Sequence, residues 1–252
     1  MTQFRVLVAL LLRETRATFG TSQIGYAWAI ITPAVGVGLL VFIFSQVGRA
    51  APFGHSLALF FATGYLLVEF FNRLSTTLMT GIEANKSLLT YPLVGEIDVL
   101  FARSFLITMT YTLIMALFFS TMWALGLAGT PRDPVALIQA FLATAWLGTG
   151  FGFFNAAIIG VWDAWRHIEK VLTRPLIFIS GVFYVPSLLP QKAVDLLWWN
   201  PLVHLVDWFR TGFYPTYPDA ILTPWWPLAL GGLFFLIGLS VERFTRSFRR
   251  LA

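Results

Sequence analysis

The sequence of 252 residues contains no cysteine, so disulfides and cysteine-ligated metal sites are excluded. Charge is also scarce, because Asp, Glu, Lys and Arg together supply 12% of the residues, about half the share found in a typical soluble domain. No Gly-Lys pair, and hence no G-x-x-x-x-G-K-[ST] phosphate loop, is present, and neither H-E-x-x-H nor G-x-S-x-G occurs. We therefore expect a chain that is not an enzyme and binds no metal or cofactor. If ATP hydrolysis drives the activity of this chain, a separate subunit must carry it out.

Apolar residues are abundant: 58% of the chain is hydrophobic and the mean hydropathy is +0.76. A membrane-spanning helix needs about 20 predominantly apolar residues to cross about 30 Å of hydrocarbon. Six stretches meet this length, at 28–47, 57–79, 104–131, 135–162, 172–189 and 220–241. We predict an all-α membrane protein with six transmembrane helices, folded as a single permease domain over residues 1–252.

Two further segments are predicted to lie at the membrane surface. Residues 1–20 place basic and apolar side chains on different sides of a helix, as an amphipathic interface helix does; the alternative is a ragged start to the first span. Residues 190–219 are rich in Trp and Tyr and have apolar runs too short to span, which indicates an external segment of short re-entrant or interfacial helices.

The net charge of +5 indicates how the chain is oriented in the membrane rather than that it binds nucleic acid. Most of the 17 Lys and Arg residues fall at one end of the predicted spans. Basic loops stay on the cytoplasmic side of a membrane. We therefore expect a multi-pass protein of a bacterial inner membrane with both termini in the cytoplasm.

Charges near the spans have two interpretations each. Glu69 and Arg73, at positions i and i+4, could form a structural pair or line a transport path. A cluster after the fourth span could be a solvated helix end or a contact for a partner; it consists of Asp163, Arg166, Glu169 and Lys170.

Small residues recur at four-residue spacing in the fourth span, at Thr144, Gly148, Gly152, Ala156 and Gly160. Such a stripe lets two helix backbones approach closely in lipid. It favours packing within the bundle, with a subunit interface as the alternative.

The segment 83–103 is short and rich in turn-forming residues, yet it carries several apolar side chains, among them Leu88, Leu89 and Tyr91. Apolar surface on a loop is typical of a docking site for another protein. The alternative is that the loop packs back on its own bundle.

Four stretches together resemble the type 2 ATP-binding-cassette exporter permeases, most closely the KpsM-like capsular polysaccharide exporters, over nearly the whole chain. They are R-E-T-R with G-T-S-Q-I-G-Y-A-W-A-I-I-T-P within 13–33, N-K-S-L-L-T-Y-P-L-V at 85–94, D-A-W-R-H-I-E-K-V-L-T-R-P at 163–175 with S-G-V-F-Y-V-P-S-L-L-P at 180–190, and N-P-L-V-H-L-V-D-W-F-R at 200–210. The second resembles the coupling helix that contacts the ATPase, and its residues here would be Asn85, Lys86, Leu88, Leu89, Tyr91 and Pro92.

The resemblance implies a homodimer with two ATPase subunits, which hold ATP and magnesium. Their closure would open a channel for a lipid-linked polysaccharide, passed on to a periplasmic adaptor and an outer-membrane channel. Membrane lipid would be a further partner, and nucleic acid would not.

A sugar cargo would stack on aromatic rings, and the candidates for a substrate channel are Tyr26, Trp28, Phe60, Tyr65, Phe70, Phe178, Phe183 and Tyr184. Lipid-facing or packing roles are the alternative. An acidic cargo or a lipid phosphate would need cations at the entrance, and the candidates are Arg16, Arg73, Arg103, Arg166 and Arg174. Each is equally suited to anchoring the cytoplasmic side.

Other functions remain open from the residues alone. The same fold could export O-antigen, teichoic acid, a lipid or a drug. An ion-coupled secondary transporter would need buried ionisable groups and often a repeat, and only Glu69 with Arg73 fits. A membrane-embedded enzyme would need clustered carboxylates, whereas Asp195, Asp207 and Asp219 are dispersed.

Overall fold

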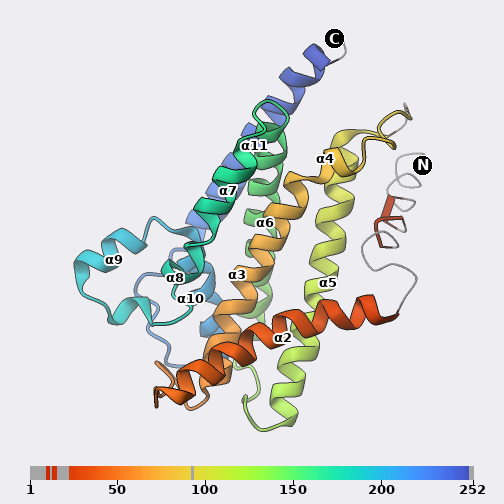
Figure 1. Cartoon of the computed structure of the whole chain (residues 1–252). Coiled ribbons are helices and arrows are strands. Elements are labelled where there is room, and N and C mark those ends of the chain that lie inside the picture. Colours follow the sequence, from red (N-terminus) through yellow and green to blue (C-terminus); the bar gives the residue numbers. More distant parts are fainter. Residues whose placement is uncertain (1–9, 12, 16–22, 92–93, 250–252) are drawn as a thin grey trace.

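The computed structural model describes residues 10–11, 13–15, 23–91 and 94–249, with only the backbone of 23–27, 29 and 245–249. All regular elements of this part of the chain are helices (Figure 1). They are α2 (Gln23–Gln46), α3 (Leu57–Met79), α4 (Gly81–Ala84), α5 (Glu96–Ala124), α6 (Pro134–Ile159), α7 (Trp165–Thr173), α8 (Leu176–Ile179), the 3-10 turn η1 (Pro186–Leu188), α9 (Gln191–Leu197), α10 (Pro201–Phe213) and α11 (Trp225–Arg249).

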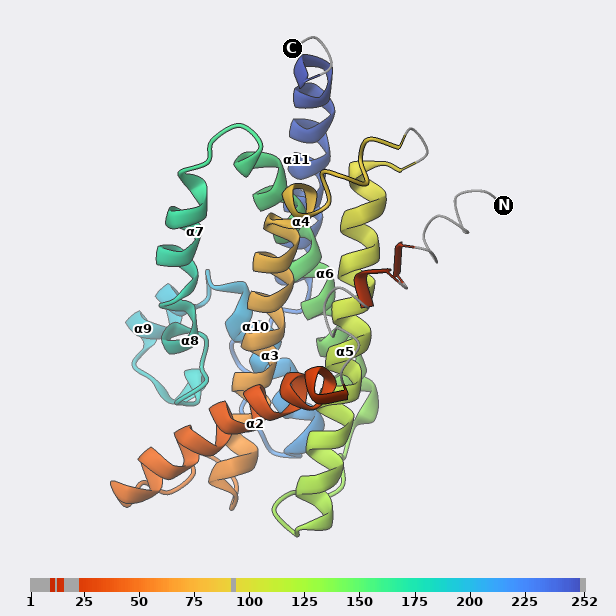
Figure 2. The ribbon, with the colours of Figure 1, turned by 45° about the vertical axis from the view of Figure 1, so that its right-hand side comes forward.

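Among the described residues, four helices are long and apolar enough to cross a membrane: α3, α5, α6 and α11. The position of the predicted first span is taken by α2, which crosses the other helices obliquely in both ribbon views (Figures 1 and 2). The predicted fifth span, 172–189, is not one helix: it contains the last residues of α7, then α8 and η1. Pro175 has no N–H to donate to the preceding turn, and Gly181, with φ of 76°, turns the chain after α8.

The sequence prediction placed residues 96–103 in a loop, but they form the first turns of α5. The Asp98 side chain accepts a hydrogen bond from the Gly95 N–H at 3.0 Å and so satisfies a free donor at the helix start. A charged residue such as Arg103 interrupts an apolar run in the sequence, but the helix continues through it. The loop that follows α4 is therefore shorter than the residues suggested.

Capping residues set the other helix starts. Ser56 accepts a hydrogen bond from the Leu59 N–H at 3.2 Å before α3, and Asp133 accepts from two N–H groups of the first turn of α6. The Asn200 side chain accepts one hydrogen bond, from the Leu202 N–H at 3.0 Å, at the start of α10. Proline follows directly at Pro134 and Pro201, where the missing N–H has no helical partner to lose.

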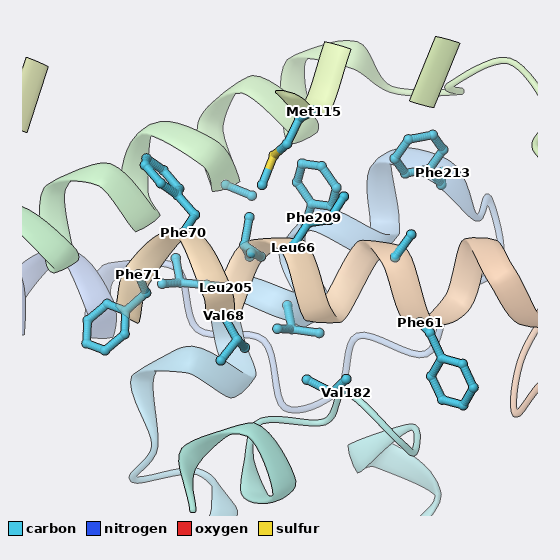
Figure 3. Close-up of a cluster of buried hydrophobic side chains, with 14 of the residues drawn as sticks. Phe61, Leu66, Val68, Phe70, Phe71, Met115, Val182, Leu205, Phe209 and Phe213 are labelled. Atoms are coloured by element: carbon cyan, nitrogen blue, oxygen red, sulfur yellow. The ribbon is translucent and has the colours of Figure 1, made fainter. Parts of the chain in front are cut away.

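The core lies around α6, whose most extensive contacts are with α11 and α3. A Cβ on Gly148 or Gly152 would approach Leu74 or Leu78 of α3 within 2.8 Å. This part of the small-residue stripe therefore packs inside the bundle, as the first interpretation predicted. Figure 3 shows part of the main cluster of buried side chains, including Phe61, Leu66, Val68, Phe70 and Phe71 of α3, Met115 of α5, Val182, and Leu205, Phe209 and Phe213 of α10.

The bundle has two distinct ends. At the α4 end lie α4, the start of α5 and the C-terminal turns of α11 (Figures 1 and 2). At the α10 end, α10 packs against α3 and α6, and the Asp133 N–H at the start of α6 donates to the Gly212 carbonyl at 3.1 Å.

Candidate functional site

The predicted coupling residues meet the N-terminal segment at the α4 end. Asn85 is 1% exposed, and its side-chain amide donates to Glu14 Oε1 at 2.8 Å and to the Gly81 carbonyl at 3.1 Å. Its side-chain oxygen accepts from Arg13 at 2.7 Å. Asn85 is therefore committed to contacts within the chain.

Glu14 extends this junction to two long helices. Its second oxygen pairs with Arg103 Nε of α5 at 3.1 Å, and Arg103 also donates to the Thr77 carbonyl of α3 at 3.3 Å. The Glu14 side chain is almost fully buried, so removing either partner would leave a costly unpaired charge. We call the set Arg13, Glu14, Asn85 and Arg103 the junction.

Apolar contacts support the junction. Leu10, Val99 and Ala102 form a small buried cluster, against which Leu11, Leu88, Leu89 and Val94 pack. The loop thus packs partly back on its own bundle, which was the alternative interpretation of its leucines. Lys86 is exposed and Tyr91 is 63% exposed, so these two side chains offer surface to a partner, while Pro92 lies outside the described residues.

A cavity of about 390 Å³ opens beside the junction, between α2, α3 and α5. Its polar lining residues are Glu14, Thr32, Glu69, Arg73, Thr77, Arg103, Thr110 and Tyr111, and its apolar ones are Trp28, Pro33, Leu106, Ile107 and Ile114. The structure brings Trp28, Arg73 and Arg103 to this cavity, which mixes charge with apolar walls.

The predicted entrance cations otherwise differ in their surroundings. Arg166 pairs with Glu83 at 2.8 Å and Asp163 at 3.2 Å, and so ties α7 to α4. These are surface pairs, which stabilise little. Arg174 is exposed at the break between α7 and α8, and Arg16 lies outside the described residues.

Glu169 belongs to a buried polar network rather than to a solvated helix end. It is 0% exposed, and its Oε1 accepts from Ser75 at 2.9 Å. Asn155 in turn donates to Ser75, and Trp165 donates to Asn155, each at 2.9 Å. The network joins α3, α6 and α7.

The predicted channel aromatics separate by burial. Phe60 and Phe70 are 0% exposed, and Phe70 stacks between Tyr111 and Phe141. In this single chain both therefore pack the core. The Tyr65 ring lies against Gly36 of α2, where a Cβ would come within 2.6 Å of it.

The remaining candidates keep exposed surface. Phe178 is 64% exposed and stacks on Phe183 at 5.5 Å between ring centroids. Phe183 and Tyr184 are half-buried in the turn after α8. The side chain of Tyr26 lies outside the described part of the chain.

Sequence reasoning missed the most heavily bonded cation. Arg210 of α10 is 0% exposed and donates to the carbonyls of Phe60, Gly181, Val182 and Tyr184 at 2.7–3.3 Å. Its guanidinium also lies 3.8 Å from the centroid of the Phe60 ring. The one available signal was a lone arginine in an aromatic, apolar segment, where burial requires partners.

Asp207 lies one turn before Arg210 and accepts from the Tyr217 hydroxyl at 2.8 Å. Burial raises the pKa of Asp207 to about 7, against the lowering effect of the nearby Arg210 charge. Together these side chains fasten α10 and the turn at 181–184 to the start of α3.

Comparisons with known proteins agree on one family. The ABC-2 type transporter family matches residues 5–214. The polysialic acid transport protein KpsM of Escherichia coli is 29% identical over 209 residues, or 83% of this chain and 81% of that protein. The capsule polysaccharide export inner-membrane protein BexB of Haemophilus influenzae is 28% identical over 213 residues, or 84% of this chain and 80% of that protein.

A third relative is aligned over nearly its whole length. The capsule polysaccharide export inner-membrane protein CtrC of Neisseria meningitidis serogroup A is 25% identical over 245 residues, or 97% of this chain and 92% of that protein. These matches confirm the resemblance seen in the residues. The chain belongs to the ABC-2 type transporter family, as a membrane subunit of that family's transporters.

Proposed function

We propose that this chain is the permease subunit of an ATP-driven exporter, which moves a lipid-linked capsular polysaccharide from the cytoplasm to the periplasm. Family membership and three relatives named for capsule export or polysialic acid transport support the cargo class. The chain has no P-loop of its own, so the energy would come from a separate ATPase.

The junction is the observation that carries this proposal. Asn85, between α4 and the exposed Tyr91, is bonded to Glu14, and Glu14 is bonded to Arg103 of α5. A force applied to this loop by a partner would therefore reach α5 and α3 through direct contacts. Lys and Arg predominate at this end, which makes the α4 end cytoplasmic under the positive-inside rule.

In the proposed assembly, two copies of this chain form a homodimer that binds two ATPase subunits. A periplasmic adaptor and an outer-membrane channel would receive the polysaccharide from the homodimer. We propose that the chain forms a single permease domain over 1–252; most of the predicted interface helix in 1–20 lies outside the described residues. Of the predicted aromatics, those with exposed surface are the better candidates for sugar contacts: Trp28, Tyr65, Phe178, Phe183 and Tyr184. O-antigen, teichoic acid, lipid and drug cargoes would use the same fold.

Tyr91→Asp tests the proposed docking surface. The chain would be co-purified with its proposed ATPase partner, and polysaccharide export per ATP hydrolysed would be measured in vesicles. A charge on an exposed interface aromatic should reduce that ratio by about tenfold. Leu89→Asp is less selective, because Leu89 also packs against the cluster of Leu10 and Val99.

Leu196→Asp is the matched control, since Leu196 is 76% exposed on α9, away from α4. Normal membrane insertion of both variants would show that folding is intact. Wild-type coupling in Tyr91→Asp would count against ATPase docking at this loop. Transport by the purified chain alone would indicate the ion-coupled class instead.

A further inference from the structure

The cavity between α2, α3 and α5 contains two charged side chains that belong to none of the ion pairs of the described residues. Among the described residues, the ion pairs are those of Arg103 with Glu14 and of Arg166 with Glu83 and Asp163. Glu69 and Arg73 both line the cavity, yet within the described part of the chain neither forms an ion pair or a side-chain hydrogen bond. Glu69 and Arg73 do not come within ion-pair distance of each other, although their charges interact at longer range.

The depth of these two side chains makes their lack of partners informative. At 1.5 Å per residue, Arg73 and Glu69 lie about 9 Å and about 15 Å along α3 from its end at Met79. Glu69 is therefore near the middle of the helix. Charge at such a depth is costly unless it is paired or meets a ligand or water.

The cavity presents these charges among walls of a particular composition. Its apolar lining includes Trp28 and Pro33 of α2 and Ile107 and Ile114 of α5. The carboxylate and the guanidinium lie one helical turn apart. A complementary ligand has one anionic and one cationic group a few ångströms apart, joined to an apolar body.

We propose that this cavity binds the headgroup of a zwitterionic phospholipid, with its phosphate on Arg73 and its primary ammonium on Glu69. Guanidinium binds phosphate oxygens with two parallel hydrogen bonds, and a primary ammonium has three N–H donors, of which at least one can be directed at a carboxylate. About 390 Å³ is ample for a headgroup and a few waters, since one water occupies about 30 Å³. Acyl chains would lie against Trp28, Pro33 and Ile114.

Headgroup chemistry predicts the selectivity of this site. A trimethylated ammonium has no N–H to donate to Glu69, and a glycerol headgroup has no cation for it. A primary-amine lipid should therefore be retained about tenfold more than either, which is the effect of one charge-assisted hydrogen bond. Lipid binding at this site requires only that the chain is embedded in a membrane. A negative result in the lipid test would therefore not contradict the proposed export function.

The test is lipid retention by the full chain. The protein would be reconstituted in vesicles of equal parts phosphatidylethanolamine, phosphatidylcholine and phosphatidylglycerol, extracted in mild detergent, and examined by native mass spectrometry. We expect phosphatidylethanolamine to predominate. Retention should fall stepwise through its N-methyl and N,N-dimethyl forms, a series that needs no variant.

Two substitutions test which lipid group each side chain binds. Glu69→Gln should abolish the preference for phosphatidylethanolamine over phosphatidylcholine, and Arg73→Gln should lower retention of all three lipids. Lys170→Gln and Asp195→Asn alter exposed charges outside the cavity and should leave the pattern unchanged. Equal retention of the three lipids, retention of none, or an unchanged preference in Glu69→Gln would overturn the proposal.

Discussion

At the scale of single residues, burial decides what a charge does in this protein. Glu14 and Arg210 are each at most 3% exposed, and each is surrounded by hydrogen-bond partners from distant parts of the chain. Arg73 is exposed to a cavity and has no ion-pair partner among the described residues. The sequence lists all three alike, as charges near apolar stretches.

Arg210→Gln should destabilise the α10 end. The substitution removes the cation over Phe60. The Phe60 carbonyl also accepts from the Thr63 hydroxyl, and Gln has two N–H donors, so at least one of the carbonyls of Gly181, Val182 and Tyr184 loses its side-chain donor, at a cost of about 1–3 kcal/mol. Thermal melting in detergent measures the effect, and we expect a clearly lower midpoint. Lys192→Gln, an exposed cation on α9, is the control, and equal midpoints for the two variants would contradict the structural role of Arg210.

At the scale of elements, close helix contacts depend on particular glycines. A Cβ on Gly238 of α11 would lie 2.7 Å from the Phe153 carbonyl carbon and 2.8 Å from the Phe154 nitrogen of α6. Backbone atoms cannot move aside as a side chain can, so these two helices approach only where α11 has no side chain. A Cβ on Gly232 would meet only Trp146 at 3.8 Å.

Gly238→Ala and Gly232→Ala therefore form a matched pair on one helix. Overpacking at Gly238 should lower stability by about 1–3 kcal/mol, whereas Ala at Gly232 should be neutral or slightly stabilising because it restricts the unfolded chain. Urea-dependent unfolding in mixed micelles measures both. A smaller loss at Gly238 than at Gly232 would show that the α6–α11 distance is not set by these backbones.

At the scale of the whole molecule, the orientation in the membrane is open to a direct test. The chain has no cysteine, so single Ser87→Cys and Lys192→Cys variants would each carry one thiol, at exposed positions. A membrane-impermeant maleimide should label Lys192→Cys in intact spheroplasts. It should label Ser87→Cys only after lysis, because the α4 end is expected to be cytoplasmic.

Label on Ser87→Cys in intact spheroplasts would reverse the orientation and remove the basis for ATPase docking at this loop. Parallel labelling after lysis shows that both thiols are reactive. Wild-type protein, which has no thiol, gives the background signal.

The sequence by itself determined the all-helical membrane class, the approximate positions of α3, α5, α6 and α11 as helices long and apolar enough to cross a membrane, and the family. These follow from runs of apolar residues and ordered motifs, which are local in the chain, and backbone hydrogen bonding in lipid leaves helices as the main way to satisfy such runs. Capping at Asp133 and Asn200 is local in the same sense. The channel aromatics, entrance cations and coupling residues were named from resemblance, and their roles remain predictions.

Only the tertiary structure decided which charges meet. Glu69 and Arg73 are one turn apart and form no ion pair, whereas Arg103 pairs with Glu14 across 89 residues of sequence and Arg210 reaches Thr63 across 147. Pairing in lipid depends on which helix faces touch, and that is set by packing over the whole bundle. The same packing placed Leu89 inward and left Tyr91 exposed. This difference cannot be predicted from the residue types, because both side chains are largely apolar.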